Sequence, residues 1–315
     1  MASASNLAFV FPGQGSQALG MLAELAAGEP LVEQCFAEAS EAIGVDLWSL
    51  SQQGPEAELN RTEFTQPALL AAGVAVWRVW TSVPDHPLPV CLAGHSLGEY
   101  TALVCAGALS LADGARLVRA RGRLMQDAVA AGSGAMAAVL ASDQELIAAA
   151  CAEAAQGQVV APANFNGPSQ TVIAGDREAV ERAIALLSDR GVKKVVRLPV
   201  SVPSHCALMQ GAAVGLGEQL DRVRWQLPAI PVIQNTDVCC YQDLQQIKDA
   251  LVRQLYTPVR WLETLQWVSE QGITRLAECG PGQVLSGLAK RFDRGLDVRS
   301  LADPAEIAKA RADWS

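Results

Sequence analysis

Short apolar runs alternate with longer amphipathic stretches along this chain. Four compact apolar runs predict strands, at residues 7–11, 90–93, 231–234 and 273–278. Six stretches in which apolar residues recur every three or four positions predict helices, at residues 31–43, 67–80, 97–106, 111–130, 205–222 and 243–255. Strands that alternate with helices in this way are typical of an α/β protein with a mainly parallel sheet.

The middle of the chain follows a different order. Its pattern predicts a strand, a helix, two strands, a helix and a strand, at residues 135–140, 143–155, 158–165, 170–174, 176–190 and 193–200. A βαββαβ succession is the ferredoxin-like arrangement. We therefore predict a ferredoxin-like subdomain at residues 132–200, inserted into a larger body formed by residues 1–131 and 201–315. A cleft between the two is the expected ligand site.

Composition indicates that the chain folds around a large core. Of its 315 residues, 50% are hydrophobic and 18% are charged, a balance that excludes disorder and fibrous repeats. No run of about 18 apolar residues is present, so we expect no membrane span. The first 60 residues contain neither Lys nor Arg, which argues against a secretory signal. We therefore expect a cytoplasmic protein. The eight Cys form no C-x-x-C pair and mostly lie in apolar runs, so we expect reduced thiols.

The net charge of −9 argues against nucleic acid as a partner. The charge is uneven, since residues 1–60 hold eight acidic residues and no Lys or Arg. An acidic partner protein would therefore have to bind at basic clusters further along the chain. Two such clusters are Lys193, Lys194 and Arg197, and Lys290, Arg291 and Arg294. The alternative is that these cations are ordinary solvated surface.

The segment Gly94-His95-Ser96-Leu97-Gly98 has the G-x-S-x-G pattern of a nucleophile elbow. It follows a predicted strand and opens a predicted helix, which is the context that such an elbow requires. The glycines permit a tight turn that exposes the Ser96 hydroxyl, and N–H groups at the helix N-terminus can stabilise an oxyanion. We therefore predict that Ser96 is a nucleophile rather than an ordinary helix cap.

A serine nucleophile needs a general base, and the sequence holds three His. His95 adjoins Ser96 in a turn that directs its side chain elsewhere, and His86 lies in a Pro-rich loop. His205 remains, at the predicted start of a helix whose dipole would lower the pKa of the imidazole and keep it neutral. No Asp or Glu stands out as the third member of a triad, so an uncharged carbonyl is the alternative partner for His205.

A glycine-rich loop, FPGQGSQ at residues 11–17, follows the first predicted strand. Its two glycines allow the backbone to approach a ligand, so the N–H of Gln14 could stabilise an oxyanion or the loop could bind a phosphate. A dinucleotide-binding fingerprint requires G-x-G-x-x-G, but the position of the last glycine is taken by Ala18. Dinucleotide binding is therefore disfavoured.

Arg121 lies on the apolar side of a predicted helix. Leu117, Leu124, Met125 and Ala128 stand at spacings of three, four and seven residues from it, which places them on the same face. A buried guanidinium without an anion would cost about 3 to 5 kcal/mol, and no acid shares this face. Its partner is either a carboxylate from another element or the carboxylate of a substrate, held bidentately.

Six motifs occur in order over nearly the whole chain. They are FPGQGSQ at 11–17, GHSLGEY at 94–100, RGRLMQ at 121–126, ANFN at 163–166, VPSH at 202–205 and RQL at 253–255. Together they resemble the malonyl-CoA:acyl carrier protein transacylases, the stand-alone bacterial enzymes of fatty acid synthesis. The resemblance implies an α/β-hydrolase-like body that carries the ferredoxin-like insert.

The resemblance also implies roles for individual residues. Ser96 would be the acylated nucleophile and His205 its base, in a ping-pong transfer of malonyl from malonyl-CoA to acyl carrier protein. The other implied positions are oxyanion donors at the N–H groups of Gln14 and Leu97, a malonyl anchor at Arg121, a His-orienting carbonyl at Gln254, and candidate substrate contacts at Asn164 and Asn166. No metal or redox cofactor is implied, and we expect a monomer.

Three other interpretations share some of these residues. An esterase or thioesterase would have the elbow and the histidine, but it would have no use for Arg121 on an apolar face. A non-catalytic module that docks carrier proteins would not need Ser96. An acyltransferase domain of a polyketide synthase shares the motifs, although the length and the early first strand favour a free-standing enzyme.

Overall fold

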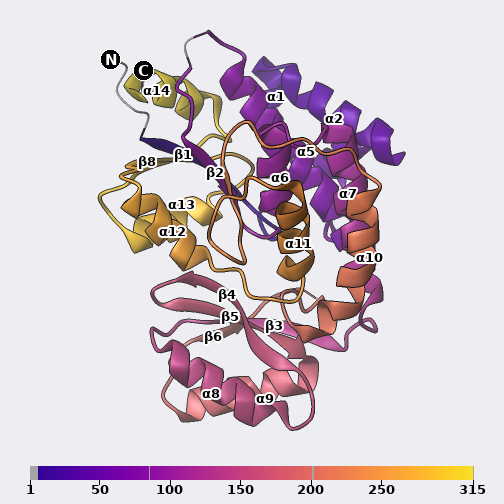
Figure 1. Ribbon diagram of the computed structural model, residues 1–315, viewed down its shortest axis with the longest axis vertical. Coiled ribbons are helices and arrows are strands. Elements are labelled where there is room, and N and C mark those ends of the chain that lie inside the picture. The colour runs from indigo at the N-terminus through magenta and orange to yellow at the C-terminus, as the bar shows by residue number, and fades with distance from the viewer. Residues whose placement is uncertain (1–5, 85, 201, 315) are drawn as a thin grey trace.

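Two β-sheets lie in different parts of the molecule (Figure 1). The structure is a computed structural model that describes residues 6–84, 86–200 and 202–314. The predicted body therefore includes some residues outside the described ones, among them residue 201 at its boundary. A five-stranded parallel sheet forms the larger part and a four-stranded antiparallel sheet the smaller part. The predicted α/β class with a mainly parallel sheet is confirmed.

The larger sheet has the strand order β7-β2-β1-β8-β9, and every neighbouring pair is parallel. Its strands are β1 (Leu7–Phe11), β2 (Cys91–Gly94), β7 (Val232–Ile233), β8 (Arg275–Glu278) and β9 (Asp297–Ser300). β1 lies at the centre and is buried along its whole length, as expected of a strand covered on both faces. Because parallel strands end at the same edge, the loops that follow β1 and β2 meet there.

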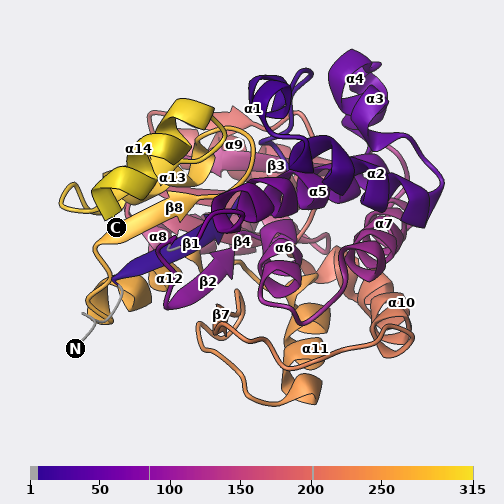
Figure 2. The ribbon, with the colours of Figure 1, turned by 90° about the horizontal axis from the view of Figure 1, so that it is seen from above.

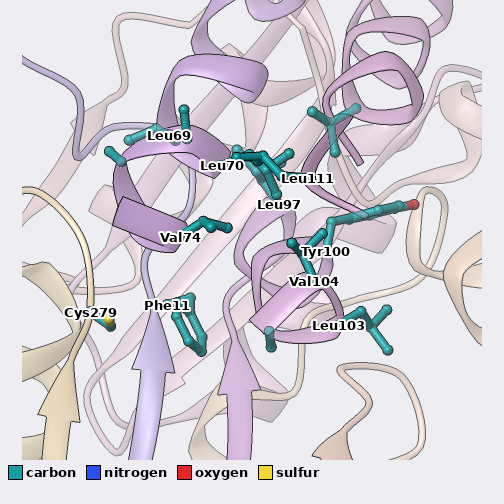
Figure 3. Packing of buried hydrophobic residues seen from close by; sticks show 14 of the residues in the cluster. Phe11, Leu69, Leu70, Val74, Leu97, Tyr100, Leu103, Val104, Leu111 and Cys279 are labelled. Carbon is teal, nitrogen blue, oxygen red and sulfur yellow. The ribbon is translucent and has the colours of Figure 1, made fainter. Parts of the chain in front are cut away.

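Helices cover both faces of this sheet. Alternate side chains of β1 point to opposite faces, so Phe9 and Phe11 join one core and Ala8 and Val10 join another. Figure 3 shows Phe11 near Val74 in the first of these cores. The helices concerned are α5 (Thr62–Thr81) and α6 (Leu97–Cys105) in the first core, and α12 (Trp261–Glu270) and α13 (Val284–Phe292) in the second.

Further helices extend the body on the side of α5. α7 (Leu111–Asp127) packs against α2, α5 and α10, and Figure 2 shows these helices together to the right of β1. The remaining helices are α1 (Ala23–Gly28), α2 (Leu31–Ile43), α3 (Leu47–Gln53), α4 (Glu56–Leu59), a 3₁₀ turn (Ala207–Met209), α10 (Gln210–Asp221), α11 (Leu244–Gln254) and α14 (Pro304–Trp314).

The smaller sheet has the antiparallel order β4-β5-β3-β6. Its elements are β3 (Gly134–Val139), α8 (Gln144–Ala155), β4 (Val160–Gly167), β5 (Gln170–Asp176), α9 (Arg177–Asp189) and β6 (Val195–Arg197). The two helices cover the face turned away from the body (Figure 1). β4 is tied to the body by backbone hydrogen bonds from the N–H of Phe165 to the carbonyl of Val259 and from the N–H of Val259 to the carbonyl of Ala163, each 2.9 Å long.

Every strand and helix predicted from the pattern has a counterpart, but two helix starts differ. The helix predicted at 67–80 begins at Thr62, so Pro67 lies inside it instead of near its start. The helix predicted at 205–222 begins at Gln210, because His205 has a positive φ of 63° and cannot belong to a helix. The elements that the pattern did not predict are α1, α3, α4, α12, β9, α13 and α14.

None of the helices in the described part of the chain is both long and apolar enough to cross a bilayer. All eight Cys carry free thiols, and five of them are buried. Burial raises the pKa of the Cys151 thiol to about 12, which leaves it protonated and unreactive at neutral pH.

Candidate active site

Ser96 stands in a tight turn between β2 and α6, at the carboxyl edge of the larger sheet. Its backbone has φ 54° and ψ −107°, a conformation that residues other than glycine rarely adopt. The turn is closed by glycines that leave no room for a side chain. A Cβ at Gly94 would lie 1.9 Å from the carbonyl carbon of Gly98, and one at Gly98 would lie 2.0 Å from the carbonyl oxygen of Phe11. The predicted elbow therefore requires glycine at both positions, because a larger residue would clash with the backbone.

The side chain of His205 contacts Ser96 from another part of the body. Its Nε2 lies 2.8 Å from the Ser96 Oγ, and its Nδ1 lies 2.6 Å from the backbone carbonyl oxygen of Gln254. A carbonyl oxygen can only accept a hydrogen bond, so Nδ1 carries the proton. Nε2 is then the acceptor for the Ser96 hydroxyl, which is the arrangement that a general base requires.

Burial lowers the pKa of His205 to about 3, and the positive charge of Arg121 contributes in the same direction. His205 does not lie in the first turn of a helix as the sequence suggested, since α10 starts five residues after it. The imidazole is therefore neutral at physiological pH and ready to accept a proton.

Arg121 projects from α7 into the site and is 1% exposed. Its Nη1 donates to the Oε1 of Gln66 and its Nη2 to the Oε1 of Gln254, both at 3.0 Å. Nη2 also lies 3.2 Å from the Ser96 Oγ, and the guanidinium stands 5.3 Å from the ring centre of Tyr100. Among the described residues, no carboxylate lies within ion-pair distance of it. Its direct hydrogen-bond partners are neutral, which leaves the cation able to pair with an anion in the cavity.

The side chain of Gln254 links Arg121 to the turn. Its Oε1 accepts from Arg121, while its Nε2 donates to the backbone carbonyl of Ser96 at 3.0 Å and to the Oε2 of Glu99 at 2.8 Å. Gln254 thus uses its backbone to orient His205 and its side chain to orient Arg121. Burial raises the pKa of Glu99 to about 7, although two hydrogen bonds to its Oε2 oppose this rise.

Three polar residues that contact Arg121, Gln254 or Ser96 were not predicted from the sequence: Gln66, Glu99 and Asn235. Gln66 is an amide inside the apolar α5, and Glu99 is a carboxylate in the buried first turn of α6. Each is a polar residue in an otherwise apolar run, which is a detectable signal, but the pattern does not name its partner. Asn235 follows the predicted strand at 231–234 directly and gave no signal of its own.

The loop and the helix that carry the predicted oxyanion donors, Gln14 and Leu97, meet at the Ser96 turn. Leu97 is the first residue of α6, so its N–H has no partner within the helix. Gln14 follows β1 in a loop that presses against the turn, since a Cβ at Gly13 would lie 2.5 Å from the carbonyl oxygen of His95. Both Gln14 and Leu97 line the same cavity as Ser96.

Asn164 and Asn166 lie on β4, line the same cavity, and are both buried. The Oδ1 of Asn166 accepts a hydrogen bond of 2.8 Å from the Nε2 of His95. This contact joins the ring of His95 to β4. His86 is engaged elsewhere, with its Nδ1 2.8 Å from the carbonyl of Val83.

A cavity of about 870 Å³ connects these groups and extends between the two sheets. One wall carries Ser96, His205 and Arg121. The four-stranded sheet and the segment after it contribute apolar lining residues and three polar ones, namely Met136, Ala138, Val172, Leu198 and Val200, and Asn164, Asn166 and Gln170. Within the described ranges, no three His, Cys, Asp or Glu side chains gather closely enough to hold a metal ion. The arrangement suits the formation of a serine ester with an acyl chain that ends in an anion.

The chain matches the model of the acyl transferase domain over residues 8–300. It is 54% identical to the malonyl CoA-acyl carrier protein transacylase of Escherichia coli over 97% of this chain and 99% of that protein, and 42% identical to the transacylase of Bacillus subtilis over 97% and 96%. The chain belongs to the malonyl CoA-acyl carrier protein transacylases. The predicted family is confirmed.

Solved structures of the family agree with this fold. The transacylase of Xanthomonas oryzae superposes with a TM-score of 0.97 at 61% identity, covering 99% of both chains. A malonyl-transacylase in complex with a type II polyketide synthase acyl-carrier protein superposes with a TM-score of 0.96 at 54% identity, covering 98% of this chain and 100% of that one.

Proposed function

We propose that this chain transfers a malonyl group from malonyl-CoA to the phosphopantetheine thiol of acyl carrier protein, through an ester on Ser96. One observation carries the proposal. The guanidinium of Arg121 is buried without a carboxylate partner, and its Nη2 lies 3.2 Å from the hydroxyl that His205 contacts. A substrate that is a thioester at one end and a carboxylate at the other fits both groups.

The first half-reaction acylates Ser96. His205 takes the hydroxyl proton on Nε2 while Oγ attacks the thioester carbonyl, and the N–H groups of Gln14 and Leu97 stabilise the oxyanion. When the tetrahedral intermediate collapses, the C–S bond breaks and the coenzyme A thiolate takes the proton from His205. The product is malonyl-Ser96, with its carboxylate on Arg121.

The second half-reaction reverses these roles with a new thiol. The phosphopantetheine S–H gives its proton to His205, the sulfur attacks the ester, and Ser96 leaves with the proton. Every step is a proton or acyl transfer, so the reaction requires no metal or redox cofactor. Malonyl-CoA and the carrier protein react one after the other at Ser96, and coenzyme A leaves in between. This order gives ping-pong kinetics.

Transfer is favoured over hydrolysis by the shape of the site. The ion pair with Arg121 fixes the acyl chain, and apolar lining residues such as Met136, Val172 and Leu198 offer no hydrogen bonds to an attacking water. Asn164 and Asn166 are proposed to contact the substrate from β4, either directly or through His95.

The architecture proposed for this reaction has two parts. We assign an α/β-hydrolase-like body to residues 1–131 and 201–315, supported by the elbow at the end of β2, and a ferredoxin-like insert to residues 132–200, supported by the order β3-α8-β4-β5-α9-β6. The cavity between them is the proposed substrate site.

The test is incubation with malonyl-CoA, followed by intact-mass measurement and addition of holo acyl carrier protein. We expect one malonyl adduct, which Ser96→Ala abolishes and which the carrier protein removes as malonyl thioester. Rapid release of free malonate at a rate indifferent to the carrier would instead support a thioesterase. An absence of any adduct on the wild-type protein would favour a non-catalytic docking module.

A further inference from the structure

The backbone of Ser96 needs an external restraint. Its φ of 54° and ψ of −107° lie outside the regions that a serine prefers, and such residues persist only where their surroundings fix them. The glycines at 94 and 98 make the turn sterically possible, but they supply no attractive force that holds it. The restraint must come from groups that bind the backbone at Ser96 or next to it.

The side-chain amide of Asn235 binds that backbone on both sides of His95. Its Nδ2 donates to the carbonyl of Gly94 at 2.6 Å, and its Oδ1 accepts from the N–H of Ser96 at 2.7 Å. The donor and the acceptor of one amide thus match a carbonyl and an N–H two residues apart. An aliphatic side chain offers neither group, and a carboxylate offers only acceptors.

Asn235 is itself rigidly placed. It is 1% exposed, and it lies directly after Gln234 at the end of the short strand β7, which is paired with β2. Its N–H donates to the Oε2 of Glu99 at 2.9 Å, and its carbonyl accepts from the N–H of Arg260 at 3.1 Å. Hydrogen bonds to both its N–H and its carbonyl therefore fix the backbone from which the side-chain amide extends to the turn.

We propose that Asn235 is a positioning residue, which holds the Ser96 turn in its strained conformation and occupies the Ser96 N–H so that the N–H of Leu97 faces the reacting carbonyl. Loss of this amide lets the turn relax, moves the Ser96 hydroxyl away from His205, and leaves the binding of malonyl-CoA intact, because Asn235 does not line the cavity. The inference rests on the proposed function, since it concerns the same acylation step.

The experiment separates chemistry from binding. The rate of malonyl-Ser96 formation is measured by rapid quench and mass spectrometry for the wild-type protein, Asn235→Ala and Gln234→Ala. The dissociation constant of malonyl-CoA is measured by calorimetry for each of these variants in a Ser96→Ala background. Gln234→Ala is the matched control, because Gln234 is also a 1% exposed amide and its side chain donates only to the carbonyl of Val232.

We expect Asn235→Ala to slow acylation about 30- to 100-fold, since small displacements of a reacting group have effects of that size, with a dissociation constant within about twofold of the wild-type value. Gln234→Ala should change the acylation rate by less than about threefold. Asn235→Asp should also slow acylation. Its carboxylate has no N–H to donate to the carbonyl of Gly94, so two oxygen acceptors would face each other.

Two results would overturn the inference alone: equal rates for the Asn235 and Gln234 variants, or a loss of binding as large as the loss of rate. If Asn235→Ala does not fold, as judged by its melting curve, the same comparison is made with Asn235→Asp, which keeps the acceptor for the Ser96 N–H and loses the donor to the carbonyl of Gly94. If the wild-type protein forms no adduct at all, the proposed function fails, and this inference fails with it.

Discussion

His205 is surrounded by groups that keep its imidazole neutral. Burial and the nearby charge of Arg121 lower its pKa to about 3, from an ordinary value of about 6.5. A lowered pKa means that the base form persists as the pH falls, and that it is lost only near pH 3. Glu99, with a pKa of about 7, gains a proton in this range, which removes a nearby negative charge and does not favour the imidazolium.

The protonation of His205 can be followed with a reagent that has no ionisable group of its own. We expect the rate at which a neutral sulfonyl fluoride modifies Ser96 to change by less than about twofold between pH 7 and pH 5. His205→Ala should react at least about 100-fold more slowly at both pH values. A rate that falls to half near pH 6.5 would show that the imidazole titrates normally.

Sequence and structure differ in what they reveal about these residues. The elbow pattern and the scarcity of His led to Ser96 and His205, and the apolar face of one helix led to Arg121. Gln254 was found only through the family resemblance, because a backbone carbonyl leaves no mark on the sequence. Asn235 escaped for a related reason, since its two partners lie about 140 positions away and no local pattern encodes that distance.

At the scale of elements, the Ser96 turn depends on how closely α6 approaches β1. Gly98 is the second residue of α6, and a Cβ there would lie 2.0 Å from the carbonyl oxygen of Phe11. Gly211 is likewise the second residue of its helix, α10, but a Cβ there would meet nothing within 4 Å. Replacing these two glycines by alanine should therefore have opposite effects on stability.

Gly98→Ala should lower the free energy of unfolding by about 1 to 3 kcal/mol, because backbone must move to admit the methyl group. Gly211→Ala should leave it unchanged or raise it by up to about 1 kcal/mol, since Ala is the better helix former. Urea denaturation of both variants measures the difference. Equal effects would mean that the close approach of α6 to β1 is not required.

Elements with a long, regular pattern were predictable, whereas short or mixed ones were not. β1 is uniformly apolar and buried, so the apolar run predicted at 7–11 has the same bounds as the strand. β9 is a four-residue edge strand of mixed polarity, which is too short to show a period. The start of α5 was misplaced because Pro67 usually marks a first turn, and here it lies in the helix interior.

At the scale of the whole molecule, the net charge of −9 opposes an acidic carrier protein, so local cations must guide the encounter. Lys193 and Lys194 are exposed just before β6, a few residues from the cavity-lining Leu198. Arg197 is partly neutralised by an ion pair of 2.6 Å with Glu181. A second exposed cluster, Lys290, Arg291 and Arg294, belongs to α13 and the loop after it.

Lys193→Glu combined with Lys194→Glu should raise the KM for acyl carrier protein about tenfold and the KM for malonyl-CoA by less than about twofold. The effect should shrink as ionic strength rises, because exposed charges are screened. Arg222→Glu with Lys309→Glu changes the net charge equally at exposed positions that do not line the cavity, and it is the control. Equal effects on both substrates would argue against docking at the first cluster.

The central claim is that the buried cation of Arg121 selects an acyl chain with a free carboxylate while Ser96 takes up the other end. The most direct test is the ratio of kcat/KM for malonyl-CoA to that for acetyl-CoA, in the wild-type protein, Arg121→Ala and the exposed control Arg123→Ala on the same helix. We predict that Arg121→Ala lowers this ratio at least about 100-fold, equivalent to ~3 kcal/mol, and that Arg123→Ala leaves it unchanged. An unchanged ratio in Arg121→Ala would contradict the claim.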